Sequence, residues 1–102
     1  NVSLRVRLVD NLLKKGMFAQ AAENQLYLAK VYTDKGSVDE AIATLRKLIE
    51  IEPDNIEARH LLGDQYRRKD MGTEALSEYQ EVVRLYQETE PNAGILRRTS
   101  DT

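Results

Sequence analysis

The sequence predicts an all-α fold of about five antiparallel helices, on three observations. First, the sequence resembles itself when it is shifted by 34 residues. Second, apolar residues recur at helical spacing between short breaks. Third, the 102 residues include only two Pro and five Gly, too few for the many turns of an all-β sandwich. Pairs that match under the 34-residue shift include Ala29 with Gly63, Tyr32 with Tyr66, Glu40 with Glu74, and Ala41 with Ala75.

The first two helices are predicted at residues 3–15 and 18–35. In the first segment Val2, Val6 and Val9 recur at helical spacing, and Gly16 is placed to end the helix. The second segment is longer and ends before Gly36. The short connection between the two segments predicts antiparallel neighbours.

The third helix is predicted from residue 37 to about residue 50. Ser37 and Glu40 have the spacing of a capping box, and Pro53 is expected to stop the helix. Asp54 is the expected cap of the fourth helix, with Glu57 three residues further on.

The fourth helix is predicted to break at Gly72. The fifth is expected to begin at Thr73 and to run toward Thr89, with Pro91 ending it. These connections of two to four residues again favour antiparallel neighbours.

A second shift, of 54 residues, also aligns the sequence with itself. Under this shift Leu8 matches Leu62, Met17 matches Met71, and Ala21 matches Ala75. Segment 18–35 therefore serves as the second helix of one pair and the first helix of the next.

We predict a helical repeat domain at 1–91 and a loosely ordered tail at 92–102. Within the domain, repeats at about 22–55 and 56–89 follow helix 3–15. Because the sequence begins at Asn1 rather than Met, we expect it to be part of a longer protein.

About two thirds of the chain resembles the tetratricopeptide repeat family. In that family small residues let two helices of a pair approach closely, and aromatic residues fill the space beside them. The resemblance implies a right-handed superhelical stack of helix pairs. It depends on repeat-core positions occupied here by Leu28, Ala29, Tyr32, Ala41, Leu45, Pro53, Leu62, Gly63, Tyr66, Ala75 and Tyr79.

The chain departs from the family pattern at three kinds of position. Gln25 and Arg59 stand where the first helix usually has an early aromatic residue. The second copy has Gln87 where Pro is usual, and Leu48 and Val82 replace small residues. We therefore expect three-helix units that share one long helix, rather than uniform helix pairs.

The resemblance implies binding of a protein or peptide on the concave surface formed by the first helices of the repeats. The family's clamp for a C-terminal carboxylate is not expected, because Leu26, Lys30 and Leu61 occupy its positions. Lys30, Arg67, Arg68 and Lys69 form a small basic spot that could accept an acidic peptide. The partner-binding residues expected on this face are Leu26, Lys30, Thr33, Asp34, His60, Asp64, Arg67 and Arg68.

Composition excludes several other functions. The net charge of −2 weighs against nucleic acid or an anionic membrane as the main partner. No apolar run is long enough to span a membrane. Cys is absent, which rules out disulfides and cysteine nucleophiles and makes a reducing compartment, the cytoplasm, our expectation.

Enzymatic activity is not expected, and neither is a cofactor or a metal. His60 is the only His, so it cannot form a His-based metal site or a catalytic triad by itself. The paired carboxylates at Asp39 and Glu40 lie at a helix start, where they offset unsatisfied N–H groups.

Two function hypotheses remain open. One is a protein-interaction module that binds a partner through its concave face or an exposed helix end. The other is a structural repeat segment whose main contacts are with neighbouring repeats or with a second copy. Helix 3–15 is apolar nearly all round, and the fifth helix ends in a run of apolar residues. Self-association through the terminal helices, with a homodimer as one form, is therefore expected.

Overall fold

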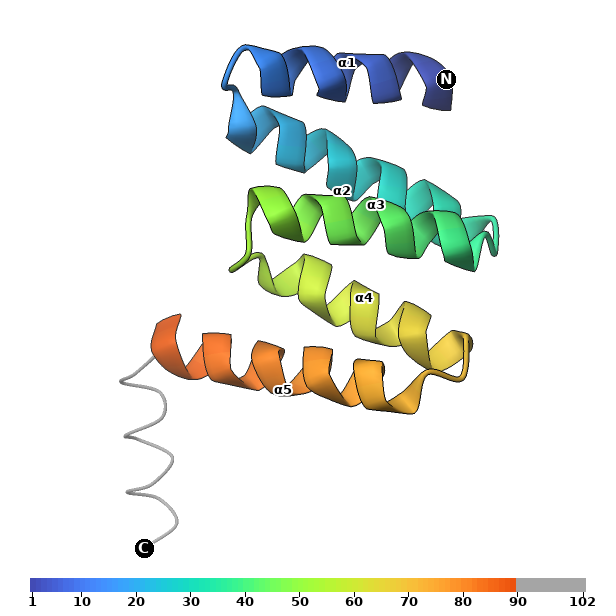
Figure 1. Ribbon diagram of the computed structural model, residues 1–102, viewed down its shortest axis with the longest axis vertical. Coiled ribbons are helices and arrows are strands. Elements are labelled where there is room, and N and C mark those ends of the chain that lie inside the picture. The colour runs from blue at the N-terminus through green and yellow to red at the C-terminus, as the bar shows by residue number, and fades with distance from the viewer. Residues whose placement is uncertain (90–102) are drawn as a thin grey trace, which may run out of the picture.

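The protein is all-α, and its five helices pack one after another in antiparallel pairs (Figure 1). The computed structural model describes residues 1–89. The predicted domain boundary at residue 91 and the tail at 92–102 lie outside this range. The helices are α1 (Val2–Lys14), α2 (Phe18–Asp34), α3 (Val38–Ile51), α4 (Ile56–Arg68) and α5 (Gly72–Thr89). None of the helices in residues 1–89 is both long and apolar enough to cross a membrane.

Three of the four turns close in the same way. The N–H groups of Met17, Ser37 and Met71 donate to carbonyls five residues earlier, at 2.9, 2.9 and 2.8 Å. The residue before each donor has a left-handed backbone, with φ of 73° at Gly16, 74° at Gly36 and 62° at Asp70. This is the Schellman arrangement, in which glycine is preferred.

The prediction that Gly72 breaks the fourth helix is therefore wrong. Asp70 is the counterpart of Gly36 under the 34-residue shift and of Gly16 under the 54-residue shift, and it occupies the left-handed position. Gly72 is instead the first residue of α5, one residue before the predicted start at Thr73.

Helix starts correct two further predictions. Ser37 lies at the start of α3, but its side chain makes no capping hydrogen bond, so the predicted capping box with Glu40 does not form. Asn55, rather than Asp54, caps α4, and its Oδ1 accepts a hydrogen bond from the Ala58 N–H at 2.9 Å. Small shifts also occur at helix bounds. α1 spans 2–14 rather than 3–15, α2 ends one residue before Lys35, and α3 extends to Ile51.

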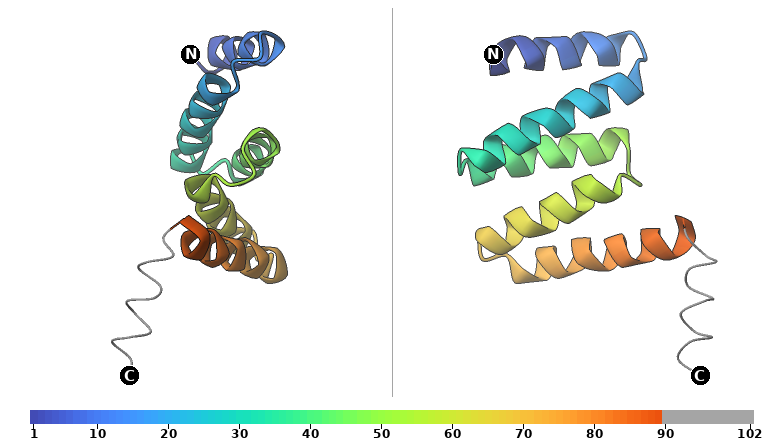
Figure 2. Two further views of the ribbon diagram at one scale, coloured as in Figure 1. Left: turned by 90° about the vertical axis from the view of Figure 1, so that its left-hand side faces the viewer. Right: turned by 180° about the vertical axis from the view of Figure 1, so that it is seen from behind.

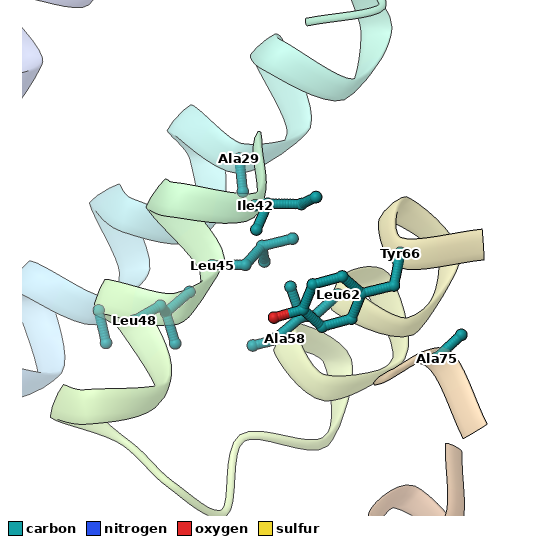
Figure 3. Packing of buried hydrophobic residues seen from close by; sticks show 9 residues of the cluster. Ala29, Ile42, Leu45, Leu48, Ala58, Leu62, Tyr66 and Ala75 are labelled. Carbon is teal, nitrogen blue, oxygen red and sulfur yellow. The ribbon is translucent and has the colours of Figure 1, made fainter. Parts of the chain in front are cut away.

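The main hydrophobic cluster lies between α2, α3, α4 and α5 (Figure 3). Its most deeply buried members are Ala29, Leu45, Leu48 and Ala58, each with 0% exposure. The other members are Ala22, Ile42, Leu62, Tyr66 and Ala75. A second cluster joins α1 to α2 and contains Val9, Leu12, Ala21 and Leu28.

Some predicted core residues lie outside the main cluster. Pro53 is exposed in the turn after α3, so it acts as a helix terminator and not as a core residue. Leu28 belongs to the second cluster, and Tyr32 is partly buried against it. Tyr79 is partly buried against the main cluster.

Small residues occupy the closest helix contacts. Ala29 and Ala41 are fully buried, and Ala75 is 4% exposed. Gly63 faces the Tyr79 ring, and a Cβ placed on Gly63 would lie 2.7 Å from Tyr79 Cε1. Because real Cβ atoms do not approach another atom so closely, the glycine is what admits the ring at this position.

Residues at equivalent repeat positions make a polar contact in each of three helix pairs. Gln25 and Arg59, which replace the family's early aromatic residue, both take part, and Arg5 matches them under the 20- and 54-residue shifts. The repeat position of Arg5, Gln25 and Arg59 thus contacts the next helix in the pairs α1–α2, α2–α3 and α4–α5. This is expected if α2 is both the second helix of one pair and the first helix of the next. The contacts are Arg5 Nη1 to Asn24 Oδ1 at 2.7 Å, Gln25 Nε2 to the Thr44 carbonyl at 3.3 Å, and Arg59 Nη1 to Glu78 Oε1 at 3.1 Å.

Candidate functional site

α2 and α4 lie on one side of the stack and α3 on the other (Figure 2). An ion pair of 2.8 Å between Lys30 Nζ and Glu57 Oε2 joins α2 to the first turn of α4. On the other side, Lys47 Nζ on α3 lies 3.3 Å from Asp10 Oδ1 on α1. We use the name α2/α4 face for the surface that carries the partner-binding residues expected from the sequence.

The α2 part of this face combines one apolar and three polar side chains. Leu26 is half-buried and packs against the main cluster, while Lys30 and Asp34 are exposed. The Thr33 hydroxyl donates to the Ala29 carbonyl at 2.8 Å, one turn earlier in the same helix. Its hydroxyl proton is thus already used within α2.

A shallow hollow of ≈470 Å³ adjoins Leu26 and Lys30. Its wall includes Arg5 from α1 and Tyr27 from α2. The Arg5 guanidinium carbon lies 3.8 Å from the centre of the Tyr27 ring, within the range of a cation–π contact. Tyr27 thus contacts α1.

The α4 part of the face centres on Asp64. The Tyr79 hydroxyl of α5 donates to Asp64 Oδ1 at 2.6 Å, and His60 Nε2 lies 4.0 Å from Asp64 Oδ2. The His60 and Tyr79 rings are tilted by 52°, with their centres 6.2 Å apart. The hydrogen bond to the Asp64 carboxylate raises the pKa of the Tyr79 phenol, and desolvation adds to this rise. At neutral pH the phenol is therefore a firmly held donor.

The basic spot expected from the sequence divides into two kinds of residue. Lys30 is paired with Glu57, and Lys69 Nζ lies 2.5 Å from Asp39 Oδ1. Arg67 and Arg68 are exposed and take part in none of the ion pairs found within residues 1–89. Within this spot, the positive charge that is in no ion pair of the described residues is therefore that of Arg67 and Arg68 at the end of α4.

Tyr79 is the contributor to this face that the sequence analysis missed. Its position in the repeat marked it as a core residue, and its ring does fill the space beside Gly63. A tyrosine, however, carries a hydroxyl beyond the ring, and here that hydroxyl reaches Asp64 across the α4–α5 pair. The signal that could have found it is a tyrosine at a position where the first copy has Leu45.

The chemistry available on the α2/α4 face is hydrogen bonding, charge pairing and apolar contact. Within residues 1–89, no group of three or more His, Asp or Glu side chains is arranged to hold a metal ion. Lys30, Thr33 and Asp64 each contact another group within the described residues, whereas Arg67 and Arg68 form no ion pair there.

Comparison with known protein families gives one result. Residues 29–70, from the last turns of α2 to the turn after α4, match the family model described as TPR repeat. Comparison with curated proteins found no match to the chain.

Proposed function

We propose that this chain, with a TPR repeat at residues 29–70, is a non-enzymatic protein–protein interaction module that binds a protein or peptide on its α2/α4 face. TPR repeats are generally protein–protein interaction modules, and the matched segment includes all of α4 and the last six residues of α2, the two helices that form this face. The absence of cysteine from the sequence suits a reducing compartment such as the cytoplasm.

The observation that carries the proposal is that α2 and α4 are both held in place by packing on α3. The Lys30–Glu57 ion pair of 2.8 Å spans the two helices on the side that carries the expected contact residues. A surface that is already ordered loses little conformational entropy when a partner binds, so more of the contact energy appears as affinity.

The Arg67–Arg68 pair at the end of α4 favours a partner segment with acidic residues. Arg67 and Arg68 can each form charge-assisted hydrogen bonds with a carboxylate, and Arg makes such pairs in a bidentate geometry. The half-buried Leu26, midway along α2, offers an apolar contact. We expect the charged contacts to set orientation and association rate, and the apolar contact to add affinity.

A second candidate function is a structural segment that associates with copies of itself through the terminal helices. The specific observation in its favour is the exposure of large apolar side chains at both ends of the stack. Leu4 of α1 is 63% exposed and Leu76 of α5 is 57% exposed. Exposed apolar surface of this kind favours association.

The test of the main proposal starts from a library of displayed peptides selected for binding to the chain. The affinity of the selected peptides is then measured by calorimetry for the wild type and for the double variant Arg67→Glu, Arg68→Glu. We expect acidic peptides to be selected and the double variant to bind them at least tenfold more weakly, which corresponds to about 1.4 kcal/mol.

The matched control is the double variant Lys14→Glu, Arg46→Glu, which makes the same change in charge at exposed positions on α1 and α3. The control should bind as the wild type does, and both variants should keep the helical circular dichroism signal. If both double variants bound the peptides as the wild type does, or if both lost affinity equally, the result would contradict a site on the α2/α4 face.

A further inference from the structure

The outer face of α5 presents apolar side chains whose counterparts in α3 are covered. Leu76 is 57% exposed, whereas its counterpart under the 34-residue shift, Ile42, is 8% exposed. Val83 is 56% exposed, whereas its counterpart Ile49 packs against the main cluster. The difference has a structural cause: α4 packs on α3, whereas within residues 1–89 no helix follows α5.

The outer face of α1 shows the complementary difference. Under the 54-residue shift, α1 corresponds to α4, so Leu4 is the counterpart of Ala58 and Leu8 is the counterpart of Leu62. Ala58 and Leu62 are 0% and 2% exposed in the cluster that joins α4 to α3. Figure 3 shows both side chains on α4 beside α3. Leu4 and Leu8 are 63% and 45% exposed.

We infer that copies of this chain stack head to tail, with the outer face of α1 from one copy docked on the outer face of α5 from the next. In this junction α5 takes the place of α3, and α1 of the next copy takes the place of α4. The junction therefore repeats between copies the packing of α4 on α3 within one chain. The two faces lie at opposite ends of the stack, so one copy can use both at once (Figure 1). This inference rests on the second candidate function, self-association through the terminal helices, and is independent of binding on the α2/α4 face.

Charge favours this pairing over the two symmetric ones. α1 contains three basic residues and one acidic residue, which gives it a net charge of +2. α5 contains four acidic residues and one basic residue, which gives it a net charge of −3. The two helices thus carry opposite net charges, which favours the approach of α1 to α5 over the approach of two like-charged helices.

A junction between two different faces leaves one unused face at each end of the assembly. Such an interface produces open chains or rings, whereas a symmetric interface stops at a dimer. We therefore expect the average mass to keep rising with concentration rather than to level off at two copies. Because the attraction between the oppositely charged helices acts through solvent, added salt should weaken the association.

The test uses two variants of the 102-residue chain, each with one end blocked. Leu76→Asp with Val83→Asp places two carboxylates on the α5 face, and Leu4→Asp with Leu8→Asp does the same on the α1 face. All four residues are exposed, so both variants should keep the helical content of the wild type. The control is Met17→Asp with Phe18→Asp, which changes exposed apolar residues at the α1–α2 turn.

The masses are measured by sedimentation equilibrium or light scattering over a range of concentrations. We expect the wild type and the control to form assemblies larger than dimers, and each blocked variant alone to remain a monomer. An equimolar mixture of the two blocked variants should form a dimer and nothing larger, because only one intact α1 face and one intact α5 face remain to pair.

Three results would overturn the inference. The first is a wild type that stays monomeric at every concentration. The second is a dimer formed by the α1-blocked variant alone, which would indicate an α5–α5 junction. The third is an equimolar mixture of the two blocked variants that stays monomeric. The Arg67→Glu, Arg68→Glu variant separates the two proposals. It should assemble as the wild type does even though it loses peptide binding, so failure of one proposal does not imply failure of the other.

Discussion

Gly63 illustrates how a single atom controls the packing of α4 on α5. Alanine is favoured over glycine inside a helix by about 1 kcal/mol, so Gly63→Ala would ordinarily stabilise the protein. Here the new Cβ would lie 2.7 Å from the Tyr79 ring. The ring cannot easily move away, because its hydroxyl is held by Asp64. Overpacking of this kind costs about 1–3 kcal/mol, which outweighs the gain in helix propensity.

We therefore predict that Gly63→Ala lowers the free energy of unfolding by up to about 2 kcal/mol. In a Tyr79→Ala background the clash is absent, and the same change should raise the free energy of unfolding by about 1 kcal/mol. Urea unfolding of the four proteins in this double-mutant cycle measures the difference. If Gly63→Ala had the same effect in both backgrounds, the close contact with Tyr79 would not be what requires the glycine.

Asp70 has a strained backbone conformation that lowers the stability of the protein. Its φ of 62° is a conformation that costs an ordinary L-residue about 1–2 kcal/mol, and glycine holds the equivalent place at Gly16 and Gly36. Asp70→Gly relieves this strain, but it also makes the unfolded chain more flexible, which costs about 0.4–1 kcal/mol. We predict a net rise of about 0.5–1 kcal/mol in the free energy of unfolding, measured by urea denaturation.

The control for Asp70 is Gly36→Ala, which removes a glycine at the equivalent position instead of introducing one. It should destabilise the protein by about 1 kcal/mol or more, because alanine must then adopt the left-handed backbone. A loss of stability on Asp70→Gly would mean that the aspartate side chain stabilises the turn more than its backbone strains it.

At the scale of the helix, α3 and α4 begin in chemically different ways. The Asn55 side chain accepts a hydrogen bond from the Ala58 N–H, whereas the Ser37 side chain makes no capping bond. Replacing a capping side chain with alanine costs about 0.5–2 kcal/mol. We predict this loss for Asn55→Ala and a much smaller one for Ser37→Ala, measured as shifts in the urea midpoint. Equal losses at the two positions would contradict the difference between the two caps.

Helix positions could be predicted well from the sequence, because the repeat period and the apolar spacing point to the same five segments. Their ends could be predicted less well. Ser37 followed by Glu40 satisfies the capping-box pattern, but the pattern does not fix the serine rotamer that the hydrogen bond requires. The helix break was predicted at Gly72 because glycine usually occupies left-handed positions. In the sequence, Asp70 is marked as the left-handed residue only by its alignment with Gly16 and Gly36.

The candidate site was harder to predict than the fold. Repeat spacing places Lys30 and Asp64 on one side of the stack, since spacing determines which face of a helix a residue occupies. Spacing does not show which neighbour a side chain contacts. Lys30 contributed to the expected basic spot but is paired with Glu57. Tyr79 was assigned to the core, yet its hydroxyl lies on the α2/α4 face beside Asp64.

At the scale of the whole molecule, contacts between successive helices dominate the fold. Each helix packs on the next, and residues at equivalent positions make a polar contact in three helix pairs. A stack of this kind has two ends and two sides, each able to serve a different role. In this account the α2/α4 side binds a partner, and the ends join copies of the chain.

The most direct test of the central claim, binding on the α2/α4 face, is to map a selected peptide onto the chain by NMR. Backbone amide shifts are followed as unlabelled peptide is added to the isotope-labelled protein. The account predicts that the largest changes fall on exposed residues of α2 and α4, including Lys30, Asp64, Arg67 and Arg68. Changes confined to the exposed sides of α3 and α5, with those of α2 and α4 unmoved, would contradict it.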